Sequence, residues 1–188
     1  MSIHLMSSRK IKRYKKGVWN TMKVLFITSE SVPFAKTGGL ADVSFALPKA
    51  LKKEGADISV IMPFYKNIAD EYKEKMEFVE YFDVKMNWRN QYAGILKYNL
   101  DGVIYYFIDN EYYFKRDGHS SSNGYYGCFD DGERFSFFNK AVIDFIVRME
   151  VKPDIIHAND WHSGMVSLLL KDQQNNGRGI DQILSLIH

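Results

Sequence analysis

A lysine, a threonine and two glycines follow the first apolar segment of the chain and have the chemistry of an anion site. Lys36, Thr37, Gly38 and Gly39 come after the apolar run 23–29 and stand directly before a helical pattern. Glycines let a ligand approach the backbone closely, and the amino end of a helix carries partial positive charge. Lysine adds a full charge on a flexible stem. The segment favours a phosphate or diphosphate site; the alternative is a tight turn beside a solvated lysine.

A second cluster of polar and aromatic residues stands near the end of a later apolar segment: His157, Asn159, Asp160, Trp161 and His162. A helix dipole disfavours a protonated ring in the first helical turn, so His162 is expected to be a neutral imidazole that hydrogen-bonds a sugar hydroxyl. Asp160 caps the helix or orients a neighbour, and Trp161 lines a sugar pocket or packs in the core. The alternative for each histidine is a structural role. The chain has no His-Glu-x-x-His pattern, and we expect no bound metal.

Several other motifs for nucleotide or nucleophile chemistry are absent from the sequence. Neither Gly-x-Gly-x-x-Gly nor a Gly-Lys-Ser/Thr loop is present, which disfavours NAD binding and ATP hydrolysis. There is no Gly-x-Ser-x-Gly elbow, and the single cysteine, Cys128, excludes a disulfide framework and has no basic partner nearby in sequence. Asp130 and Asp131 precede a helical pattern, and their types and position by themselves indicate helix capping.

The elements that must position these residues alternate between strand and helix. Continuous apolar runs at 23–29 and 57–62 predict strands buried on both faces, and a helix is expected between them at 40–54. The expected apolar face of this helix consists of Leu40, Val43, Leu47 and Leu51. The strand–helix–strand unit indicates an α/β fold with a doubly wound parallel sheet.

The middle of the chain has a different pattern before the alternation resumes. Residues 77–108 predict an antiparallel β insertion beside the parallel sheet, with Asp101 and Gly102 as a two-residue hairpin turn. The remaining expected elements are a long loop at 109–129, a helix at 131–149, a strand at 153–157, a helix from Trp161 or His162, a polar loop at 173–179 and a strand at 183–188. The expected apolar face of the helix at 131–149 consists of Phe135, Phe138, Val142, Phe145 and Met149.

Composition and charge limit the class of protein. The 188 residues are 46% apolar, which excludes intrinsic disorder. The net charge of +2 comes from residues 1–21, which contain six basic and no acidic residues. The rest of the chain has 19 basic and 23 acidic residues. We expect a flexible basic extension ahead of Met22. The alternative is an arm that binds nucleic acid or an anionic membrane. On the folded part we expect no nucleic-acid surface. No signal-type or membrane-spanning apolar run is present, so a cytoplasmic protein without a membrane partner is expected.

Two blocks of the sequence resemble bacterial glycogen synthases and plant starch synthases. The first block comprises 23–30, Pro33 with Phe34, 36–43 and 46–48, and the second block is 153–162. The run Lys-Thr-Gly-Gly-Leu-Ala-Asp-Val at 36–43 is highly specific for the family. The resemblance covers about 22–188 in register. It implies the Rossmann-like amino-terminal domain of a two-domain GT-B glycosyltransferase. Such enzymes transfer glucose from ADP-glucose to the non-reducing end of an α-1,4-glucan with retention, and need no cofactor or metal.

The resemblance also implies roles for individual residues. Lys36, with Thr37, Gly38 and Gly39, matches the segment that contacts the ADP-glucose diphosphate. His162 matches a histidine that hydrogen-bonds the transferred glucose, and Asp130 matches an aspartate near that glucose. Supporting positions are expected at Asp42, Asn159, Asp160 and Trp161. The family often has histidine where Asn159 stands, which affects only fine positioning.

Length is the main departure from the family, whose members are more than twice as long. We expect a chain truncated by trimming, by its gene model or by a frameshift, which lacks the second Rossmann-like domain and is inactive alone. One alternative is a stand-alone glucan-binding or regulatory fragment with affinity for maltooligosaccharide and no turnover. Another is a different α/β nucleotide enzyme that binds NAD or a flavin. Oligomeric state and regulation are not predicted by the sequence.

Overall fold

A mixed β-sheet forms the centre of the computed structural model, which describes residues 21–116, 124–149, 151–177, 180 and 182–187. The predicted basic extension lies outside these residues except for Thr21. Within the described residues the sheet has seven strands in the order β3-β4-β5-β2-β1-β6-β7. They are β1 (Lys23–Ile27), β2 (Asp57–Pro63), β3 (Glu77–Met86), β4 (Arg89–Leu100), β5 (Val103–Asp109), β6 (Ile155–Ala158) and β7 (Leu184–Ile187).

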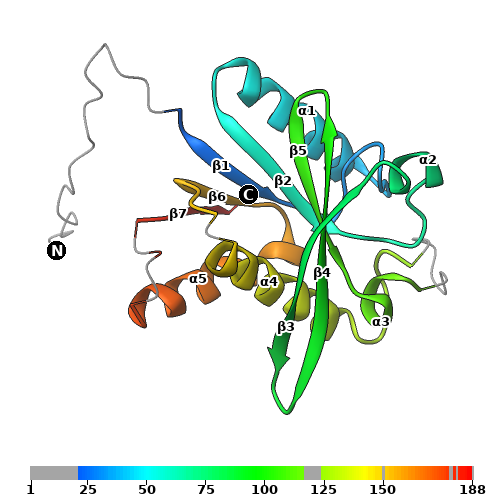
Figure 1. Cartoon of the computed structure of the whole chain (residues 1–188), viewed down its shortest axis with the longest axis vertical. Helices are drawn as coiled ribbons and strands as arrows, with labels where there is room; N and C mark the ends of the chain where they lie inside the picture. The colour runs from blue at the N-terminus through cyan, green and yellow to red at the C-terminus, as the bar shows by residue number, and fades with distance from the viewer. Residues whose placement is uncertain (1–20, 117–123, 150, 178–179, 181, 188) are drawn as a thin grey trace, which may run out of the picture.

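Helices cover the two faces of the sheet (Figure 1). The helical elements are α1 (Gly39–Lys53), α2 (Asp70–Lys73), α3 (Glu111–Phe114), α4 (Asp131–Arg148), the 3-10 turn η1 (Trp161–Ser163) and α5 (Met165–Asn175). In Figure 1, α1 lies on one side of the sheet and α4 with α5 lies on the other. β5, β2, β1, β6 and β7 are mutually parallel. The predicted doubly wound α/β fold is therefore confirmed.

Burial explains why the apolar runs form the central strands. In β1, residues Val24 to Ile27 are all buried, and β2 is buried from Val60 onward. A strand covered by helices on both faces needs apolar side chains at successive positions, because neither face meets water. The aromatic residues of α4, including Phe138 and Phe145, complete this core.

The antiparallel insertion differs from its prediction at one strand. β3 pairs antiparallel with β4, and β4 pairs antiparallel with β5, as expected. β5, however, also pairs in parallel with β2, so it belongs to the main sheet, and only β3 and β4 extend the edge. The turn prediction is confirmed, since both Asp101 and Gly102 have positive φ, as a tight hairpin with right-handed twist requires.

Three details of the predicted helices are wrong, and the loop predicted at 109–129 contains the short helix α3. Val43 is 44% exposed, because α1 buries the adjacent face formed by the small residues Ala41, Ser44 and Pro48. The hydroxyl oxygens of Ser44 and Thr28 are 2.8 Å apart. Because the helix approaches the strand this closely, a small polar side chain is favoured at position 44. The helix expected from Trp161 or His162 begins at Met165, after the separate turn η1. The polar loop expected from residue 173 begins later, since α5 continues to Asn175.

The strand order reverses at β1, in the centre of the sheet. The chain moves from β1 through α1 to β2 on one side of β1, whereas β6 lies on its other side. In a doubly wound sheet, such a reversal separates the loops that follow the two strands and leaves a ligand crevice at their carboxyl ends. Ile27 at the end of β1 lies opposite Ala158 at the end of β6. Both motifs singled out by the sequence therefore leave the sheet at this reversal.

Two glycines provide a test of the hairpin geometry. Gly102 has φ of 84°, whereas Gly132 in the first turn of α4 has ordinary helical geometry and open space where a Cβ would be placed. Replacing Gly102 by Ala should destabilise the chain by about 1 kcal/mol, since a side chain is strained in the left-handed region. Gly132→Ala should leave the stability unchanged or raise it by up to about 1 kcal/mol, as alanine favours helices. Urea unfolding of both variants measures this, and equal effects would refute the assigned turn.

Candidate functional site

The two sequence motifs meet at the carboxyl ends of β1 and β6. The backbone N–H of Asn159 donates to the carbonyl of Ile27 over 3.0 Å, and its side-chain amide donates to the same carbonyl over 3.0 Å and to that of His157 over 3.1 Å. Asn159 is fully buried, and its own carbonyl accepts from the Ser163 hydroxyl. Asn159 thus joins the two loops and sets the start of the turn that carries His162.

Glu30 organises the loop that follows β1, although the sequence analysis assigned it no role. Its carboxylate is only 2% exposed and accepts from the Thr37 backbone N–H over 2.5 Å and from the Thr37 hydroxyl over 3.0 Å. These contacts fold the segment 31–36 into a closed loop and place Gly38 at the amino end of α1. The position of an acidic residue directly after a buried strand was the available signal.

Lys36, Gly38 and Gly39 lie on the open side of this loop. The Lys36 ammonium contacts both carboxylate oxygens of Asp42, at 2.7 and 2.9 Å, and both side chains are more than half exposed. Neither glycine has a positive φ, and a Cβ at either position would meet no atom within 4 Å. The backbone conformation therefore does not require glycine, and the effect of the two glycines is to leave the space in front of the helix free.

The amino end of α1 has unused hydrogen-bonding capacity. Gly38 occupies the capping position, and no side chain caps the helix there. The first backbone N–H groups of a helix have no intrahelical partner, so an uncapped end presents them to whatever lies in front of it. Together with Lys36, this end of α1 has the donors and the charge that suit an anion.

His162 lies in an aromatic enclosure beside the loop. Its side chain is 3% exposed and packs against the rings of Trp161, Tyr126 and Phe135, with centroid separations of 3.9, 4.3 and 4.7 Å. Both imidazole nitrogens are buried and have no hydrogen-bond partner among the described residues. Buried polar atoms are normally paired, because an unpaired one costs about 1–3 kcal/mol. The described part of the chain therefore leaves both nitrogens of this ring available to a ligand.

Burial also decides the charge of His162. Loss of hydration lowers the pKa of the imidazole to about 4, although the negative charges of Asp160 and Asp131 act to raise it. The ring is therefore neutral near pH 7, with one nitrogen able to donate and the other able to accept. A neutral His162 was expected from its place in a helical turn; the structure attributes it mainly to desolvation.

Tyr126 connects the histidine to the loop after β1 and was missed by the sequence analysis. Its ring packs on His162, while its hydroxyl lies 3.0 Å from the Ser29 hydroxyl and interacts with the side chains of Thr37 and Glu30. Burial raises the pKa of this phenol well above its usual value, so it stays protonated. Tyr126 is 97 residues away from Ser29 in sequence, and no local pattern could have revealed the contact.

The residues between Asn159 and His162 take an unusual path. Asp160 has φ of 61° and ψ of 174°, a combination that is essentially restricted to glycine, and its carboxylate accepts from the Trp161 N–H over 2.6 Å. This capping contact confirms one predicted role of Asp160. Trp161 is 55% exposed while one edge packs on Phe135, so it is neither wholly core nor wholly solvated. Such strain is kept where the surrounding structure determines it, which often marks a functional site.

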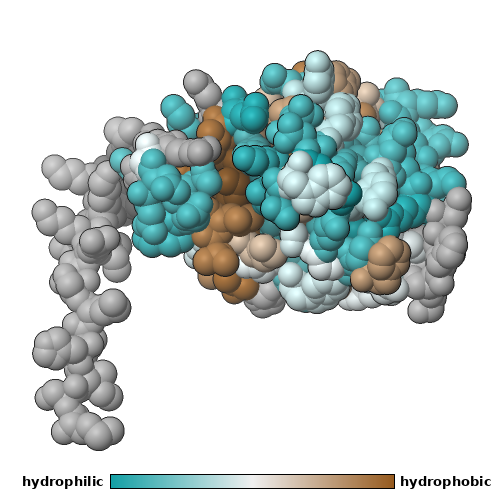
Figure 2. Space-filling model, turned by 90° about the horizontal axis from the view of Figure 1, so that it is seen from below, coloured by the Kyte–Doolittle hydropathy of each residue, from teal (hydrophilic) through white to brown (hydrophobic). Residues whose placement is uncertain are grey.

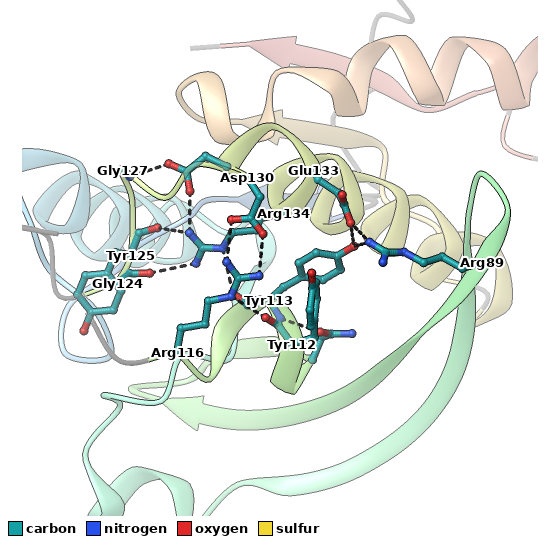
Figure 3. Close-up of polar contacts among 12 residues, drawn as sticks. Arg89, Tyr112, Tyr113, Arg116, Gly124, Tyr125, Gly127, Asp130, Glu133 and Arg134 are labelled. Carbon is teal, nitrogen blue, oxygen red and sulfur yellow. Dashed lines mark hydrogen bonds and ion pairs between the residues drawn. The ribbon is translucent and has the colours of Figure 1, made fainter. Parts of the chain in front are cut away.

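Asp130 does not cap α4 through its side chain, contrary to the sequence prediction. Its carboxylate instead pairs with Arg116 in a two-pronged contact, both N–O distances being 2.7 Å (Figure 3). This contact lowers the pKa of Asp130. The carboxylate therefore faces the segment after α3. The Asp130 backbone carbonyl accepts from the N–H groups of Glu133 and Arg134.

Arg134 secures the segment that carries Tyr126. Its guanidinium is fully buried and donates to the carbonyls of Tyr113 and Gly124 and to the carboxylate of Asp131, over 2.9, 3.0 and 2.7 Å (Figure 3). Asp131 in turn accepts from the Gly127 N–H over 2.6 Å. The first turn of α4 thus fixes the backbone on either side of Tyr126, at Gly124 and at Gly127.

Two features are absent from the described residues, namely a cluster of metal ligands and a helix that could cross a membrane. No three histidine, cysteine, aspartate or glutamate side chains in that part of the chain are grouped as metal ligands would be. None of the helices in the same part is both long and apolar enough to cross a membrane.

The low pKa of His162 predicts a specific loss of stability in acid. The unfolded chain binds a proton near pH 6.5 and the folded chain only near pH 4, so stability falls as the pH drops through this window. The shift corresponds to about 3 kcal/mol. His162→Gln, which cannot be protonated there, should lose about that much less stability between pH 7 and pH 4 in urea titrations. Parallel pH profiles for the two proteins would contradict a buried neutral imidazole.

Comparison with known proteins agrees with the geometry. Residues 23–188 match the family model of the starch synthase catalytic domain. The chain is 54% identical over 150 residues to a glycogen synthase from Clostridium botulinum, covering 80% of this chain and 30% of that protein. It is 50% identical over 165 residues to one from Clostridioides difficile, covering 88% and 34%.

A solved structure shows the same fold. The catalytic domain of starch synthase IV from Arabidopsis thaliana, bound to ADP and acarbose, matches with a TM-score of 0.80 and 27% identity over 89% of this chain and 33% of that one. The chain spans about a third of the length of the relatives that it matches. On the family match and these similarities, the chain belongs to the starch synthase catalytic domain family.

Proposed function

We propose that this chain forms the amino-terminal side of the active site of a glucosyltransferase. The enzyme would move glucose from ADP-glucose to the non-reducing end of an α-1,4-glucan in the cytoplasm, as in glycogen synthesis. The observation that carries the proposal is His162: a buried, neutral imidazole with both nitrogens unpaired among the described residues, beside an uncapped helix end at the reversal of the sheet. That arrangement offers one group for a sugar hydroxyl and another for an anion.

The donor diphosphate would lie at the amino end of α1. The free N–H groups there and the space in front of Gly38 and Gly39 suit a phosphate oxygen. Lys36 would turn from Asp42 to the diphosphate at little cost, because an exposed ion pair contributes only about 0–1 kcal/mol. A positive charge there stabilises the leaving group as the bond to glucose breaks.

The transferred glucose would lie near His162. A neutral ring serves as donor and acceptor to sugar hydroxyls without placing a positive charge beside the cationic sugar of the transition state. Arg116 keeps Asp130 ionised, so a carboxylate near the glucose would favour that developing charge. Asp160 and Asn159 would hold the turn, and Trp161 would offer an exposed ring face to the saccharide.

The similarities support both ligand classes. The relatives from Clostridium botulinum and Clostridioides difficile are named glycogen synthases, and the Arabidopsis domain was solved with ADP and acarbose. The segment with Lys36 and the turn with His162 lie inside the matched region 23–188. We therefore assign the nucleotide-sugar to the crevice between β1 and β6, with the other side of the cleft provided by a second domain.

Binding of ADP-glucose to the chain tests the proposed donor site. Lys36→Gln should raise the dissociation constant at least tenfold in calorimetry, because the only full positive charge of the loop is removed. Lys49→Gln is a matched control, since Lys49 also forms an exposed ion pair, with Asp101, but on the hairpin side of α1. Both variants should unfold within about 1 kcal/mol of the parent. Equal affinities of the two variants would contradict the donor site.

Activity is tested in a chimera. Residues 22–188 would replace the matching part of the Clostridioides difficile relative, which is 50% identical over 165 residues. The chimera should elongate maltoheptaose with ADP-glucose, and His162→Gln should reduce kcat at least a hundredfold, as the loss of a group that acts in the transition state does. A folded chimera that binds ADP-glucose and keeps its kcat in the His162→Gln variant would refute the role of this ring.

A further inference from the structure

A cavity lies at the amino-terminal edge of the sheet, at the opposite end of the strands from the candidate site. Its volume is about 310 Å³. It is lined by the first residues of β1 and β2, by the last turn of α1 and by the segment that leads into β6. Three of its lining side chains are the lysines Lys23, Lys52 and Lys152. We call it the lysine cavity.

The positive charge of the lysine cavity is only partly compensated. Asp57, at the start of β2, is the one acidic residue that lines it, so the lining residues have a net charge of +2. Among the residues that the structure describes, the three ammonium groups form no ion pair or hydrogen bond, although Lys23 and Asp57 are register partners in β1 and β2. A concave site with charge of one sign raises the local concentration of oppositely charged molecules. The cavity therefore attracts anions.

Helix stability alone does not explain the lysines. A cation in the last turn of a helix interacts favourably with the helix dipole, and Lys52 occupies that position in α1. Lys53 lies in the same turn and has the same favourable interaction, but it does not line the cavity. Lys23 and Lys152 lie outside the helices and contribute to the same cavity. What the three lysines share is the cavity.

The inner wall of the lysine cavity is apolar. Ile58 is buried there, and Met149 adds a second apolar side chain just after α4. The ring of Tyr106 packs against Phe145 of α4, with the centroids 4.9 Å apart. Such a contact holds the phenol ring in place, so an apolar group can lie against it without ordering it first. The wall therefore suits an anion that also has an apolar part.

Charge and size together define the class of ligand. A phosphate monoester has a charge of about −1.5 to −2 at pH 7, which balances the net charge of the cavity, whereas a carboxylate balances only half of it. Lysine ammonium groups bind phosphate as point charges. The Asp57 carboxylate opposes anions of higher charge. A volume of about 310 Å³ is small for a ligand pocket, so the organic part is about one ring in size.

The exposed hydrophobic surface of the molecule does not define a ligand in this way. Figure 2 shows hydrophobic side chains gathered in a band toward the side where Figure 1 places α5 and β7. Exposed side chains of these two elements include Leu168, Leu184, Leu186 and Ile187. Nothing on that surface identifies what covers it. The lysine cavity, in contrast, has both a charge and a shape that a ligand must match.

We propose that the lysine cavity binds a small phosphate monoester that carries an apolar ring. This site is separate from the crevice that we assign to the nucleotide-sugar, because the two lie at opposite ends of β1. The strand has five residues that rise about 3.3 Å each, so the two ligands do not touch. The inference does not depend on the proposed reaction, and the two ligands should bind without competition.

The test measures binding of phenyl phosphate to the full chain in the presence of saturating ADP-glucose, which occupies the donor crevice. Calorimetry at low ionic strength should show one site. Lys52→Gln should weaken binding about tenfold, because one of the three cations that contact the phosphate is lost. Lys53→Gln is the matched control, since Lys53 is an exposed lysine of the same helical turn. It should change the affinity less than about twofold, and urea unfolding should show equal stability of the two variants.

Two further ligands separate the parts of the proposed molecule. Inorganic phosphate lacks the ring and benzoate has only one negative charge, so each should bind about tenfold more weakly than phenyl phosphate. Inorganic phosphate that binds as tightly as phenyl phosphate would contradict the role of the apolar wall and overturn the proposal.

Two results with the chain itself would also overturn the site. Equal phenyl phosphate affinities of the Lys52→Gln and Lys53→Gln variants would show that the cavity does not hold the phosphate. Displacement of phenyl phosphate by ADP-glucose would place the probe in the donor crevice. The donor site is judged separately, from the ADP-glucose affinity of the Lys36→Gln variant, so each of the two sites can fail without the other.

Discussion

The hydrogen bonds from Asn159 to the end of β1 set the positions of both loops of the site. One carbonyl, that of Ile27, receives both the backbone and the side-chain N–H of Asn159 in the buried centre of the sheet. Because these bonds are shielded from water, they hold the ends of β1 and β6 at a fixed separation. The loop with Lys36 and the turn with His162 start from those two points.

The turn that carries His162 is locally unfavourable, and the packed core around it provides the stabilisation that keeps it in place. A buried imidazole without a partner among the described residues and a non-glycine residue at φ of 61° are each unfavourable by about 1–3 kcal/mol. The aromatic enclosure of His162 and the buried strands around it stabilise the turn in this conformation. In the proposed function, a ring that its surroundings keep neutral would need no rearrangement before it bonds a sugar hydroxyl.

The first turn of α4 connects three parts of the molecule that are distant in sequence. Asp130 holds Arg116, Arg134 holds the carbonyl of Gly124, and Glu133 holds Arg89 at the tip of the hairpin. The fully buried Arg134 strongly restricts where its partners can lie, because a buried charge is unfavourable unless it is paired. The other two contacts are partly exposed and fix their partners by geometry. The segment with Tyr126 and the tip of the β3–β4 hairpin are positioned by the same helical turn.

The amino-acid sequence alone is enough to predict the strands, the hairpin turn and the two motifs. Apolar runs such as 24–27 depend on local composition, and Asp101 with Gly102 fits a turn that needs positive φ at both residues. The sequence did not reveal the roles of Glu30, Tyr126 and Arg134, because their partners come from distant segments. For the same reason, the predicted capping role of the Asp130 side chain was wrong. The three-dimensional packing was needed to show that β5 joins the parallel sheet, and that His162 is desolvated and has no hydrogen-bond partner among the described residues. Hydrogen bonding and hydration depend on what packs around a group, and a linear pattern does not contain that information.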